Sequence, residues 1–305
     1  MPAEPRSLHL PSLVAVIIGK QIGSKTCRFV PHGIKPLADA DRSPSMTIAS
    51  APVRAKRLKS IAFALLTSRS ARWLIGLWFG DTVPFRGTRI KTASRGSFEA
   101  PLLLAGIYER AEIDFVHRHI PTTQRVIELG ASLGGNSCQI ARTLAPGVPM
   151  LCVEANPEIV GILRENIARN CGTRPVEVLH GMIGDAPGEG ILEIGGSTLA
   201  SGAGHRGVRT ARVPMYSLAE VVDRIGADPY SLVADIEGAE VAFLTVNREA
   251  LARCTVMIIE CHATEFRGRR YTLDEVLALP LQAGEWEMVD RYHAVAVYRR
   301  IAPAR

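Results

Sequence analysis

The sequence predicts an α/β fold with a mostly parallel seven-stranded sheet, helices on both faces and one antiparallel strand near the C-terminus. From about residue 100, short apolar runs alternate with stretches of helical spacing, which is typical of parallel strands joined by helices. The first apolar run leads through a glycine-rich turn into a helix. Only residues 291–293 separate the last two runs, so these strands must form a hairpin and the final strand is antiparallel to its neighbour.

Each element follows from local spacing. Residues 102–119 place apolar side chains on one side of a single helix before the sheet. Apolar runs then predict strands at 125–129, 149–154, 176–180, 231–235, 256–261, 285–290 and 294–298. Helical spacing predicts helices at about 135–145, 157–170, 217–225, 238–247 and 272–279. The glycine-rich residues 184–212 interrupt this alternation and form either a flap over the site or a surface insertion.

Composition narrows the class of protein. The chain has 305 residues, of which 47% are hydrophobic and 22% charged, so a wholly disordered or fibrous chain is excluded. Charged residues interrupt every apolar run before about 18 residues, so no membrane-spanning helix is predicted. Six cysteines lack a CxxC pair, which argues against a disulfide framework or a zinc site and indicates a reducing compartment. We therefore expect a cytoplasmic protein and assign it no metal site.

The positive charge is concentrated at the start of the chain. The net charge is +6, but residues 1–60 hold ten basic and three acidic side chains, an excess of +7 that leaves the remainder near neutrality. Nucleic-acid binding by the remainder is therefore not expected. We expect residues 1–50, which contain several prolines, to be a disordered leader, residues 51–120 a helical N-terminal extension, and residues 121–305 the domain that holds the sheet.

Residues 52–80 combine a basic start with apolar runs. Arg69 and Arg72 interrupt the apolar part, so it does not span a bilayer. A basic amphipathic helix is typical of peripheral contact with an anionic membrane surface. Such segments more often pack on their own domain or on another subunit, as in a homo-oligomer, and the sequence leaves these alternatives open.

The turn after the first strand and the acid that ends the second strand predict a nucleoside ligand. Gly130 and Gly135 fit the first and third glycines of the G-x-G-x-x-G fingerprint for dinucleotides, but Ser132 replaces the second. The following helix presents free amide hydrogens, which suit a carboxylate or a phosphate. Glu154 ends the second strand, where a carboxylate can accept hydrogen bonds from both ribose hydroxyls.

Several stretches together resemble a known family. VIELGASLGGNS, LCVEANPEIVGILRENIARN, LVADIEGAEVAFL and MIIECH occur in the same order as in FkbM-type methyltransferases, and IYERAEIDFV resembles the lead-in helix of that family. The resemblance covers roughly residues 100–300. It implies the class I methyltransferase Rossmann-like fold, the cofactor S-adenosyl-L-methionine, and a methyltransferase domain at residues 121–305.

The resemblance also implies cofactor contacts, position by position. Glu128 and the glycine-loop backbone would surround the methionine part, and Glu154 would hold the ribose. Met182 and Ile183 would line the adenine. The full implied set is Glu128, Gly130, Ala131, Ser132, Asn136, Ser137, Glu154, Ala155, Asn156, Met182, Ile183 and Asp235.

The chain departs from the family pattern at three positions. The family usually has aspartate where this chain has Glu128 and asparagine where it has Ser132, and both changes keep a hydrogen-bonding group. The family often has lysine where this chain has Ala234. We therefore expect Asp235 to lack an adjacent positive charge.

Polar groups at the ends of the fourth and fifth strands are the candidates for chemistry. Asp235 and Glu237 flank one residue, so in an extended segment they point the same way, and Glu260 and His262 stand in the same relation. A hydroxyl acceptor is a weak nucleophile at neutral pH and benefits from a nearby base. We assign catalysis to Asp235, Glu237 and His262, with Asp235 as the base or the substrate-orienting group and His262 as its rival.

These observations predict a methyltransferase that uses S-adenosyl-L-methionine and acts on a hydroxyl of a saccharide or another small-molecule or glycan acceptor. A catalytically inactive methyltransferase fold that serves as a binding protein is the alternative, and the missing lysine favours it. An NAD-dependent oxidoreductase is a third reading, which Ser132 and the terminal hairpin disfavour. Cofactor binding without turnover would separate the second reading from the first.

Overall fold

The computed structural model describes residues 61–194, 201–202, 209–226 and 229–301. The predicted leader, residues 1–50, lies outside these residues. Among the described residues, none of the helices has both the length and the apolar character needed to cross a bilayer.

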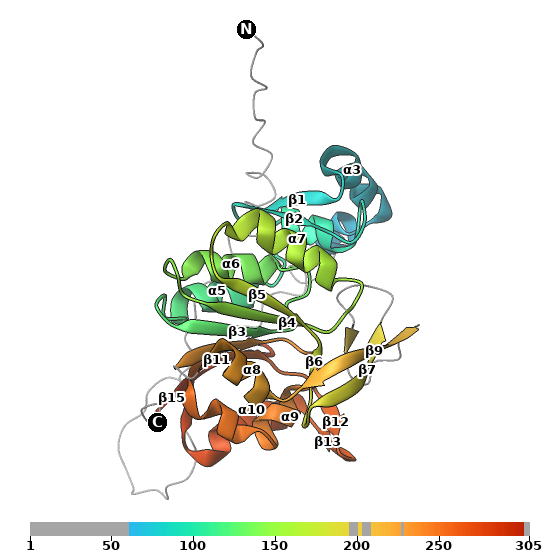
Figure 1. Cartoon of the computed structure of the whole chain (residues 1–305). Coiled ribbons are helices and arrows are strands. Elements are labelled where there is room, and N and C mark those ends of the chain that lie inside the picture. Colours follow the sequence, from blue (N-terminus) through green and yellow to red (C-terminus); the bar gives the residue numbers. More distant parts are fainter. Residues whose placement is uncertain (1–60, 195–200, 203–208, 227–228, 302–305) are drawn as a thin grey trace, which may run out of the picture.

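The centre of the molecule is a seven-stranded sheet in the order β14-β15-β11-β10-β3-β4-β5 (Figure 1). All its strands run parallel except β15, which is antiparallel to both of its neighbours. This confirms the predicted sheet and its one reversed strand. The bounds are β3 (Arg125–Leu129), β4 (Met150–Glu154), β5 (Val176–His180), β10 (Tyr230–Ala234), β11 (Cys254–Glu260), β14 (Trp286–Tyr292) and β15 (Val295–Arg300).

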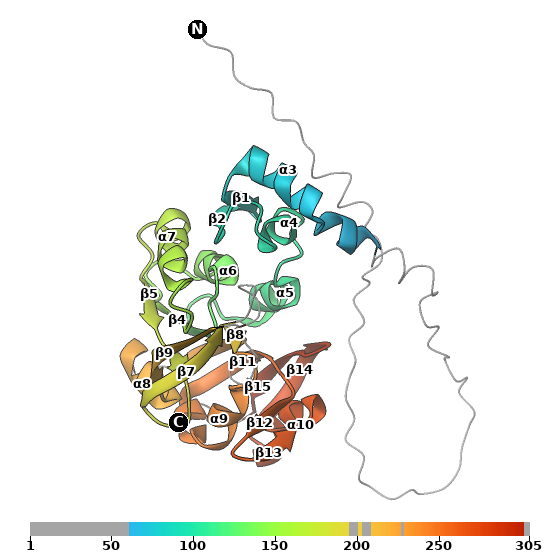
Figure 2. The same ribbon diagram turned by 90° about the vertical axis from the view of Figure 1, so that its right-hand side faces the viewer.

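Helices cover both faces of the sheet (Figures 1 and 2). One face carries α5 (Arg110–His119), α6 (Gly135–Thr143) and α7 (Val160–Cys171). The other face carries α8 (Leu218–Ile225), α9 (Glu240–Thr245) and α10 (Leu273–Ala278), with short 3₁₀ helices at Arg248–Arg253 and Pro280–Ala283.

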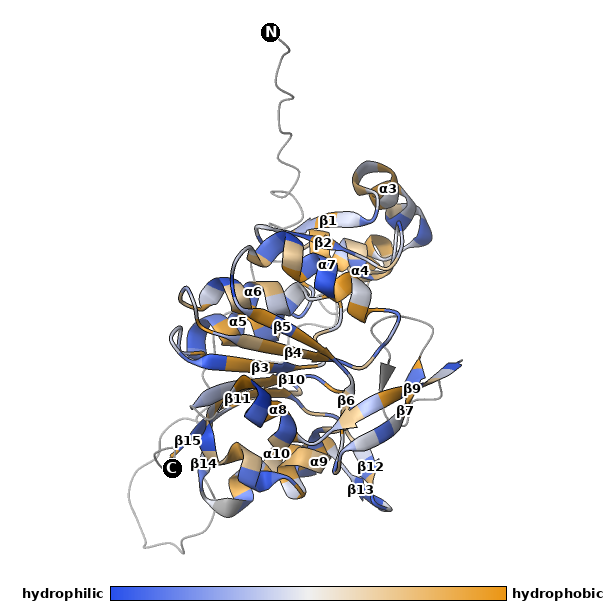
Figure 3. Ribbon diagram, viewed as in Figure 1, coloured by the Kyte–Doolittle hydropathy of each residue, from blue (hydrophilic) through white to orange (hydrophobic). Residues whose placement is uncertain are grey.

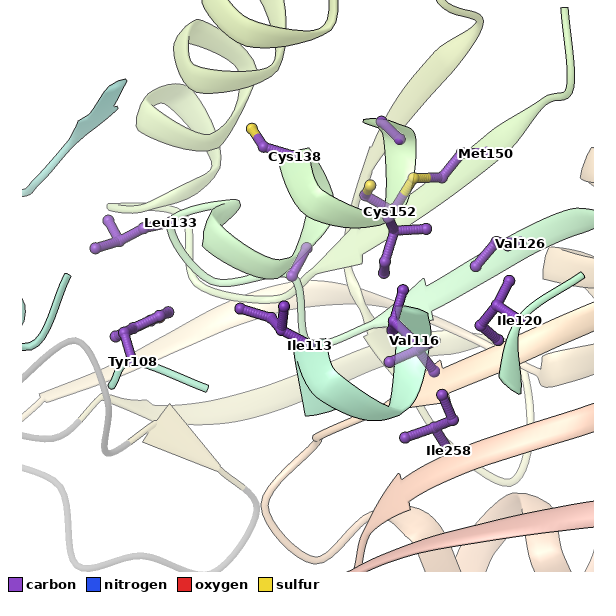
Figure 4. Packing of buried hydrophobic residues seen from close by; sticks show 14 of the residues in the cluster. Tyr108, Ile113, Val116, Ile120, Val126, Leu133, Cys138, Met150, Cys152 and Ile258 are labelled. Atoms are coloured by element: carbon purple, nitrogen blue, oxygen red, sulfur yellow. The ribbon is translucent and has the colours of Figure 1, made fainter. Parts of the chain in front are cut away.

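Alternation along the strands builds two cores, one on each face. In β11, Val256 and Ile258 lie in the core under α5, while Met257 and Ile259 lie in the core on the other face. Figure 4 shows Val116 of α5 and Ile258 in the first of these cores. Figure 3 shows the hydrophobic colour along the central strands. Because both faces are covered, these strands consist of nearly continuous apolar runs.

The segment before the sheet is broken rather than one helix. It forms α4 (Glu99–Leu104) and α5, which a turn separates. Gly106 and Glu109 in that turn have φ of 66° and 43°. These are left-handed conformations, which an α-helix cannot contain, so the predicted single helix over 102–119 is wrong.

The N-terminal extension is only partly helical. After α3 (Arg69–Phe79), β1 (Thr82–Phe85) and β2 (Thr88–Lys91) form an antiparallel hairpin that the sequence analysis did not predict. The side-chain amide of Asn166 on α7 bonds both backbone groups of Lys91, at 2.7 and 2.8 Å. The predicted boundary at residue 120 also places α5 in the extension, although α5 packs on the sheet.

A second, smaller sheet contains part of the glycine-rich insertion. It comprises β6 (Met182–Ile183), β7 (Gly188–Ile194), β8 (Ser201–Gly202) and β9 (Arg209–Tyr216), in the order β6-β9-β7-β8. β7 and β9 pair antiparallel over seven residues each, so the expected flap or insertion is a hairpin in its described part. Another hairpin, β12 (Thr264–Phe266) and β13 (Arg269–Tyr271), follows β11.

Candidate functional site

The candidate site lies where the carboxyl ends of four central strands meet. β3, β4, β10 and β11 are neighbours and run parallel, so the residues that follow them gather at one edge of the sheet. All the predicted catalytic residues and half of the predicted cofactor residues lie in these four connections.

The glycine loop after β3 is fitted to its own protein surroundings. Gly130 has φ of 82°, and a Cβ there would collide with the backbone carbonyl oxygen of Asp235. A Cβ at Gly135 would meet the ring of Tyr108 at 3.0 Å. The sequence analysis matched Gly130 and Gly135 to a dinucleotide fingerprint, but packing within the chain already requires glycine at both positions. As a result, the glycine loop touches the end of β10 directly.

Glu154 ties two loops of the site together. One of its carboxylate oxygens accepts a hydrogen bond from the backbone N–H of Ser132 (2.7 Å), and the other accepts one from the N–H of Asn156 (2.6 Å). The side chain is buried, and burial raises its pKa while these backbone amides oppose the rise. The backbone of Ala155 is a third hydrogen-bond partner, and a carboxylate offers about four acceptor sites. Glu154 therefore holds the glycine loop against the end of β4 and can still accept a hydrogen bond from a ligand.

The residues implied to line the adenine lie beside the small sheet. Ala155 presents its carbonyl oxygen to the ring of His180, 3.2 Å from Nε2. Met182 packs beside Leu192 and Val213 of the small sheet. Ile183 is 3% exposed and lies in the core with α8 and α9. Their contact with adenine stays a prediction.

Polar atoms without hydrogen-bond partners lie beneath the glycine loop. Within the described part of the chain, Glu128 Oε2, Asn136 Oδ1 and Ser137 Oγ are buried and make no hydrogen bond. Burial raises the pKa of Glu128 to about 7. Buried polar groups usually have partners, so this cluster fits a ligand that brings both donors and charge. The ammonium and carboxylate of the methionine part of S-adenosyl-L-methionine are such groups.

His262 lies among three acids at the ends of β10 and β11. Its Nδ1 is 3.1 Å from Oε1 of Glu240, and its Nε2 is 3.6 Å from Glu237 and 3.9 Å from Asp235. Oε1 of Glu240 also accepts a 3.2 Å hydrogen bond from the backbone N–H of Gly238. The predicted catalytic residues Asp235, Glu237 and His262 are therefore brought together.

The backbone that brings them together is not the extended one expected. Glu237 has φ of 53°, a left-handed conformation, so Asp235 and Glu237 do not alternate as in a strand. Both carboxylates still face His262 because the chain turns at Gly238 into α9. Glu240, which opens α9, also holds the turn, as the Gly238 bond shows.

The pKa values of His262 and Asp235 are both raised above their ordinary values, for different reasons. Burial lowers the pKa of His262, but the hydrogen bond and charge of Glu240, with Asp235 and Glu237, outweigh it and raise that pKa to about 9. Burial and the charge of Glu260 raise the pKa of Asp235 well above its ordinary value, and His262 opposes this. His262 is therefore protonated at neutral pH. The expectation that Asp235 lacks an adjacent positive charge is wrong, although Ala234 itself is buried in the core.

The sequence analysis missed two acids that interact with this cluster, Glu109 and, on α5, Glu112. Oxygens of Glu112, Asp235 and Glu260 lie within 4.8 Å of one another. Glu112 is 4% exposed, and its Oε1 makes no hydrogen bond to any residue that the structure describes. A signal was present, because Glu112 stands three and four residues before Phe115 and Val116 and so falls on the apolar face of that helix.

The same donors could hold a cation. One atom each from Asp235, Glu237 and His262 lie within 4.8 Å of one another, as do the oxygens of the Glu112 group. Carboxylate oxygens with one imidazole suit several divalent metals. The sequence analysis assigned no metal, and that assignment stays a prediction.

The chain was compared with known proteins. Residues 130–288, slightly more than half of the chain, match the model of a family described as the methyltransferase FkbM domain. No curated protein matches the chain. Among solved structures, an rRNA methylase from Streptococcus thermophilus is similar at 10% identity and a TM-score of 0.39, over 64% of this chain and 96% of that one.

Two further solved structures are similar at the same level. An O-methyltransferase from Bacillus cereus in complex with SAH shares 16% identity at a TM-score of 0.37, over 62% of this chain and 79% of that one. The M. jannaschii tRNA m1G37 methyltransferase shares 11% identity at a TM-score of 0.38, over 72% and 56%. The family match, rather than these structures, determines the assignment.

Proposed function

Because this chain belongs to the FkbM methyltransferase family, we propose that it transfers the methyl group of S-adenosyl-L-methionine to a hydroxyl oxygen of a saccharide or another small polyhydroxylated acceptor. The cytoplasm is the proposed location, as the cysteine usage suggests. One observation carries the proposal. Asp235 contacts the glycine loop through its backbone and His262 through its carboxylate. A methyl donor in the loop and a proton acceptor would therefore be neighbours.

The cofactor is proposed to occupy the loop that follows β3. Glu128 and Asn136 would receive the methionine end, where their buried oxygens make no hydrogen bond within the described residues. Ser137, in the first turn of α6, lies where helix amides favour a carboxylate. Glu154 would accept a hydrogen bond from the ribose hydroxyls with its remaining acceptor capacity.

The chemistry proposed for this chain is removal of one proton from the acceptor. Bound S-adenosyl-L-methionine supplies a methyl group activated on a sulfonium sulfur. The acceptor oxygen would receive that methyl group, S-adenosylhomocysteine would be the leaving group, and the hydroxyl proton would pass to Asp235. The raised pKa of Asp235 makes its carboxylate a stronger base than an ordinary aspartate.

His262 is proposed to serve as a fixed cation rather than as the base. With a pKa of about 9 it already carries its proton at neutral pH. The buried carboxyl of Glu240 holds the ring in place, and Nε2 faces Asp235 and Glu237. This arrangement supports Asp235 over His262 as the group that takes the proton.

The first test is calorimetric titration of the purified chain with S-adenosylhomocysteine, with NAD as the competing ligand and Glu154→Ala as the variant. Binding of S-adenosylhomocysteine that the variant loses would support the proposal. Binding of NAD alone, or of neither ligand, would overturn it.

A second test separates an enzyme from an inactive binding fold. Methyl transfer to polyhydroxylated acceptors would be assayed with Asp235→Asn and, in parallel, with a chelator. Binding of the cofactor without transfer to any acceptor would favour the binding protein. Activity that is lost with the chelator and restored by a divalent cation would replace the base role of Asp235 with metal ligation.

A further inference from the structure

The N-terminal helices expose an unusual number of large apolar side chains. Residues 61–66 and α3 lie at the outside of the molecule, as Figures 2 and 3 show. Trp78 is 84% exposed and Trp73 is 63% exposed. The exposed apolar residues of these two helical segments, called here the α3 surface, are Ile61, Phe63, Leu65, Trp73, Leu74, Leu77, Trp78 and Phe79.

The core of the α3 surface is one face of one helix. Trp73, Leu74, Leu77 and Trp78 have the spacing i, i+1, i+4 and i+5, which places them side by side. Gly76 is buried on the opposite side, where a Cβ would meet the backbone N of Gly96 at 3.0 Å. The helix is therefore fixed to the protein by its glycine side and presents its apolar side outward.

Charge in the described segment that carries the α3 surface is mostly positive. Residues 61–98 contain one acidic side chain, Asp81, and six basic ones, a net charge of +5. The basic residues are Arg69, Arg72, Arg86, Arg89, Lys91 and Arg95, of which Arg86 pairs with Asp114 and Lys91 with Glu165. An exposed apolar patch rimmed by one sign of charge marks an interaction site for a partner of the opposite sign.

We propose that the α3 surface lies on an anionic lipid bilayer, with Trp73 and Trp78 inserted among the headgroups. A bilayer surface supplies negative charge and an apolar interior together, as this surface requires. An RNA partner would need polar contacts to phosphates, which the apolar face does not offer. A second copy of the chain would bring the same positive charge to the α3 surface and so be repelled. Residues 1–50 would also bring positive charge, since they carry six basic and three acidic side chains.

The bilayer lies close to the candidate site in this arrangement. α3 packs on α4, and the hydroxyl of Tyr108, four residues after α4, donates to Oγ of Ser132 in the glycine loop at 3.3 Å. The membrane contact does not depend on methyl transfer, so the two proposals can fail separately.

The test uses the full chain and vesicles of phosphatidylcholine with or without phosphatidylglycerol. We expect co-sedimentation with the anionic vesicles only, a blue shift of tryptophan emission on binding, and weakening as ionic strength rises. Trp286 is buried and is the remaining tryptophan, so the shift reports Trp73 and Trp78. Failure to bind anionic vesicles would overturn the proposal.

A matched pair of variants locates the contact. Trp73→Ser with Trp78→Ser should weaken vesicle binding by about tenfold or more, because two interfacial aromatic anchors are lost. Ile191→Ser with Tyr292→Ser removes two exposed apolar side chains elsewhere and should leave binding unchanged. Equal losses in the two double variants would contradict the proposal.

Two further experiments test the other possible partners of the α3 surface, a second copy of the chain and RNA. Sedimentation velocity over a range of protein concentrations tests for a second copy. We expect the parent chain and the Trp73→Ser, Trp78→Ser variant to show the same association state. A single-stranded RNA should not displace the protein from vesicles at equal phosphate concentration. Self-association that the tryptophan variant abolishes would assign the α3 surface to a second copy of the chain. Displacement of the protein from vesicles by RNA would assign it to nucleic acid.

Discussion

Nδ1 of His262 lies 3.1 Å from Oε1 of Glu240, a carboxyl group whose side chain is completely buried. Burial by itself lowers the pKa of His262, and Glu240 is the largest of the influences that raise it. The charge state of the site therefore depends on a residue that no solvent reaches.

Replacing Glu240 should lower the pKa of His262. In Glu240→Gln we expect the pKa of His262 to fall below about 9, because the effect of burial is then opposed only by Asp235 and Glu237. Imidazole proton resonances in a pH titration measure this, with His262→Gln identifying the signal. Glu265→Gln removes an exposed carboxyl paired with Arg270 and should leave the titration unchanged. A pKa still near 9 in Glu240→Gln would contradict the assignment.

Ionisation of Glu128 should make the cofactor-free protein less stable as the pH rises. Burial raises its pKa from 4.5 to about 7, so the folded protein holds this proton more tightly than the unfolded chain. The resulting stability is complete below pH 4.5 and is lost as the pH rises through 7. At about 1.4 kcal/mol per pKa unit, the loss is on the order of 3 kcal/mol.

Chemical denaturation at several pH values measures that loss. Glu128→Gln does not ionise, so the free energy of unfolding should depend less on pH between 4.5 and 7 than in the parent chain. Asp274→Asn removes an exposed carboxyl on α10 and is the control. The same pH dependence in the parent chain and in Glu128→Gln would be evidence against this account.

Glu154→Gln should weaken cofactor binding although it barely changes the shape of the side chain. The backbone N–H groups of Ser132 and Asn156 both point at the carboxylate, and an amide would place an NH₂ against one of them. An unsatisfied buried donor costs about 1–3 kcal/mol. We expect reduced thermal stability and an affinity for S-adenosylhomocysteine lower by about tenfold or more. Unchanged affinity by calorimetry would show that cofactor binding does not depend on the hydrogen bonds of Glu154 to Ser132 and Asn156.

Two glycines with nearly the same backbone angle separate conformational strain from collision. Gly130 and Gly147 have φ of 82° and 81°, but only a Cβ at Gly130 meets another atom, the carbonyl oxygen of Asp235. Gly147→Ala should cost roughly 1–2 kcal/mol, the penalty of a left-handed alanine. Gly130→Ala should cost about 1–3 kcal/mol more, because the chain must move away from β10. Equal free energies of unfolding for the two variants would be inconsistent with the contact.

The main sheet could be predicted because its signals are local. β3 and β5 have the predicted bounds, and β15 is reversed because residues 291–293 leave room only for a turn. The breaks in regular elements were less visible. Glu109 adopts φ of 43°, which its residue type does not favour and which tertiary packing imposes.

The sequence predicted which residues form the site better than it predicted how they are arranged. Asp235, Glu237 and His262 do meet, but through a left-handed Glu237 rather than an extended strand. Glu112 was missed because spacing along α5 indicates only that this acid is buried, not that it meets Asp235 and Glu260 from other elements. The charge of His262 depends on Glu240, a partner that only the folded chain supplies.

The position of β15 has a consequence for how the protein is made. Among the described residues it is the last strand, yet it is an inner strand of the sheet, hydrogen-bonded to β11 on one side and β14 on the other. On the ribosome, β11 therefore keeps an open edge until residue 300 has emerged, and such an edge can pair with another nascent chain. A chain whose translation stops before residue 295 lacks β15 and exposes the edge of β11. We expect chaperones and proteases to act on such a truncated product.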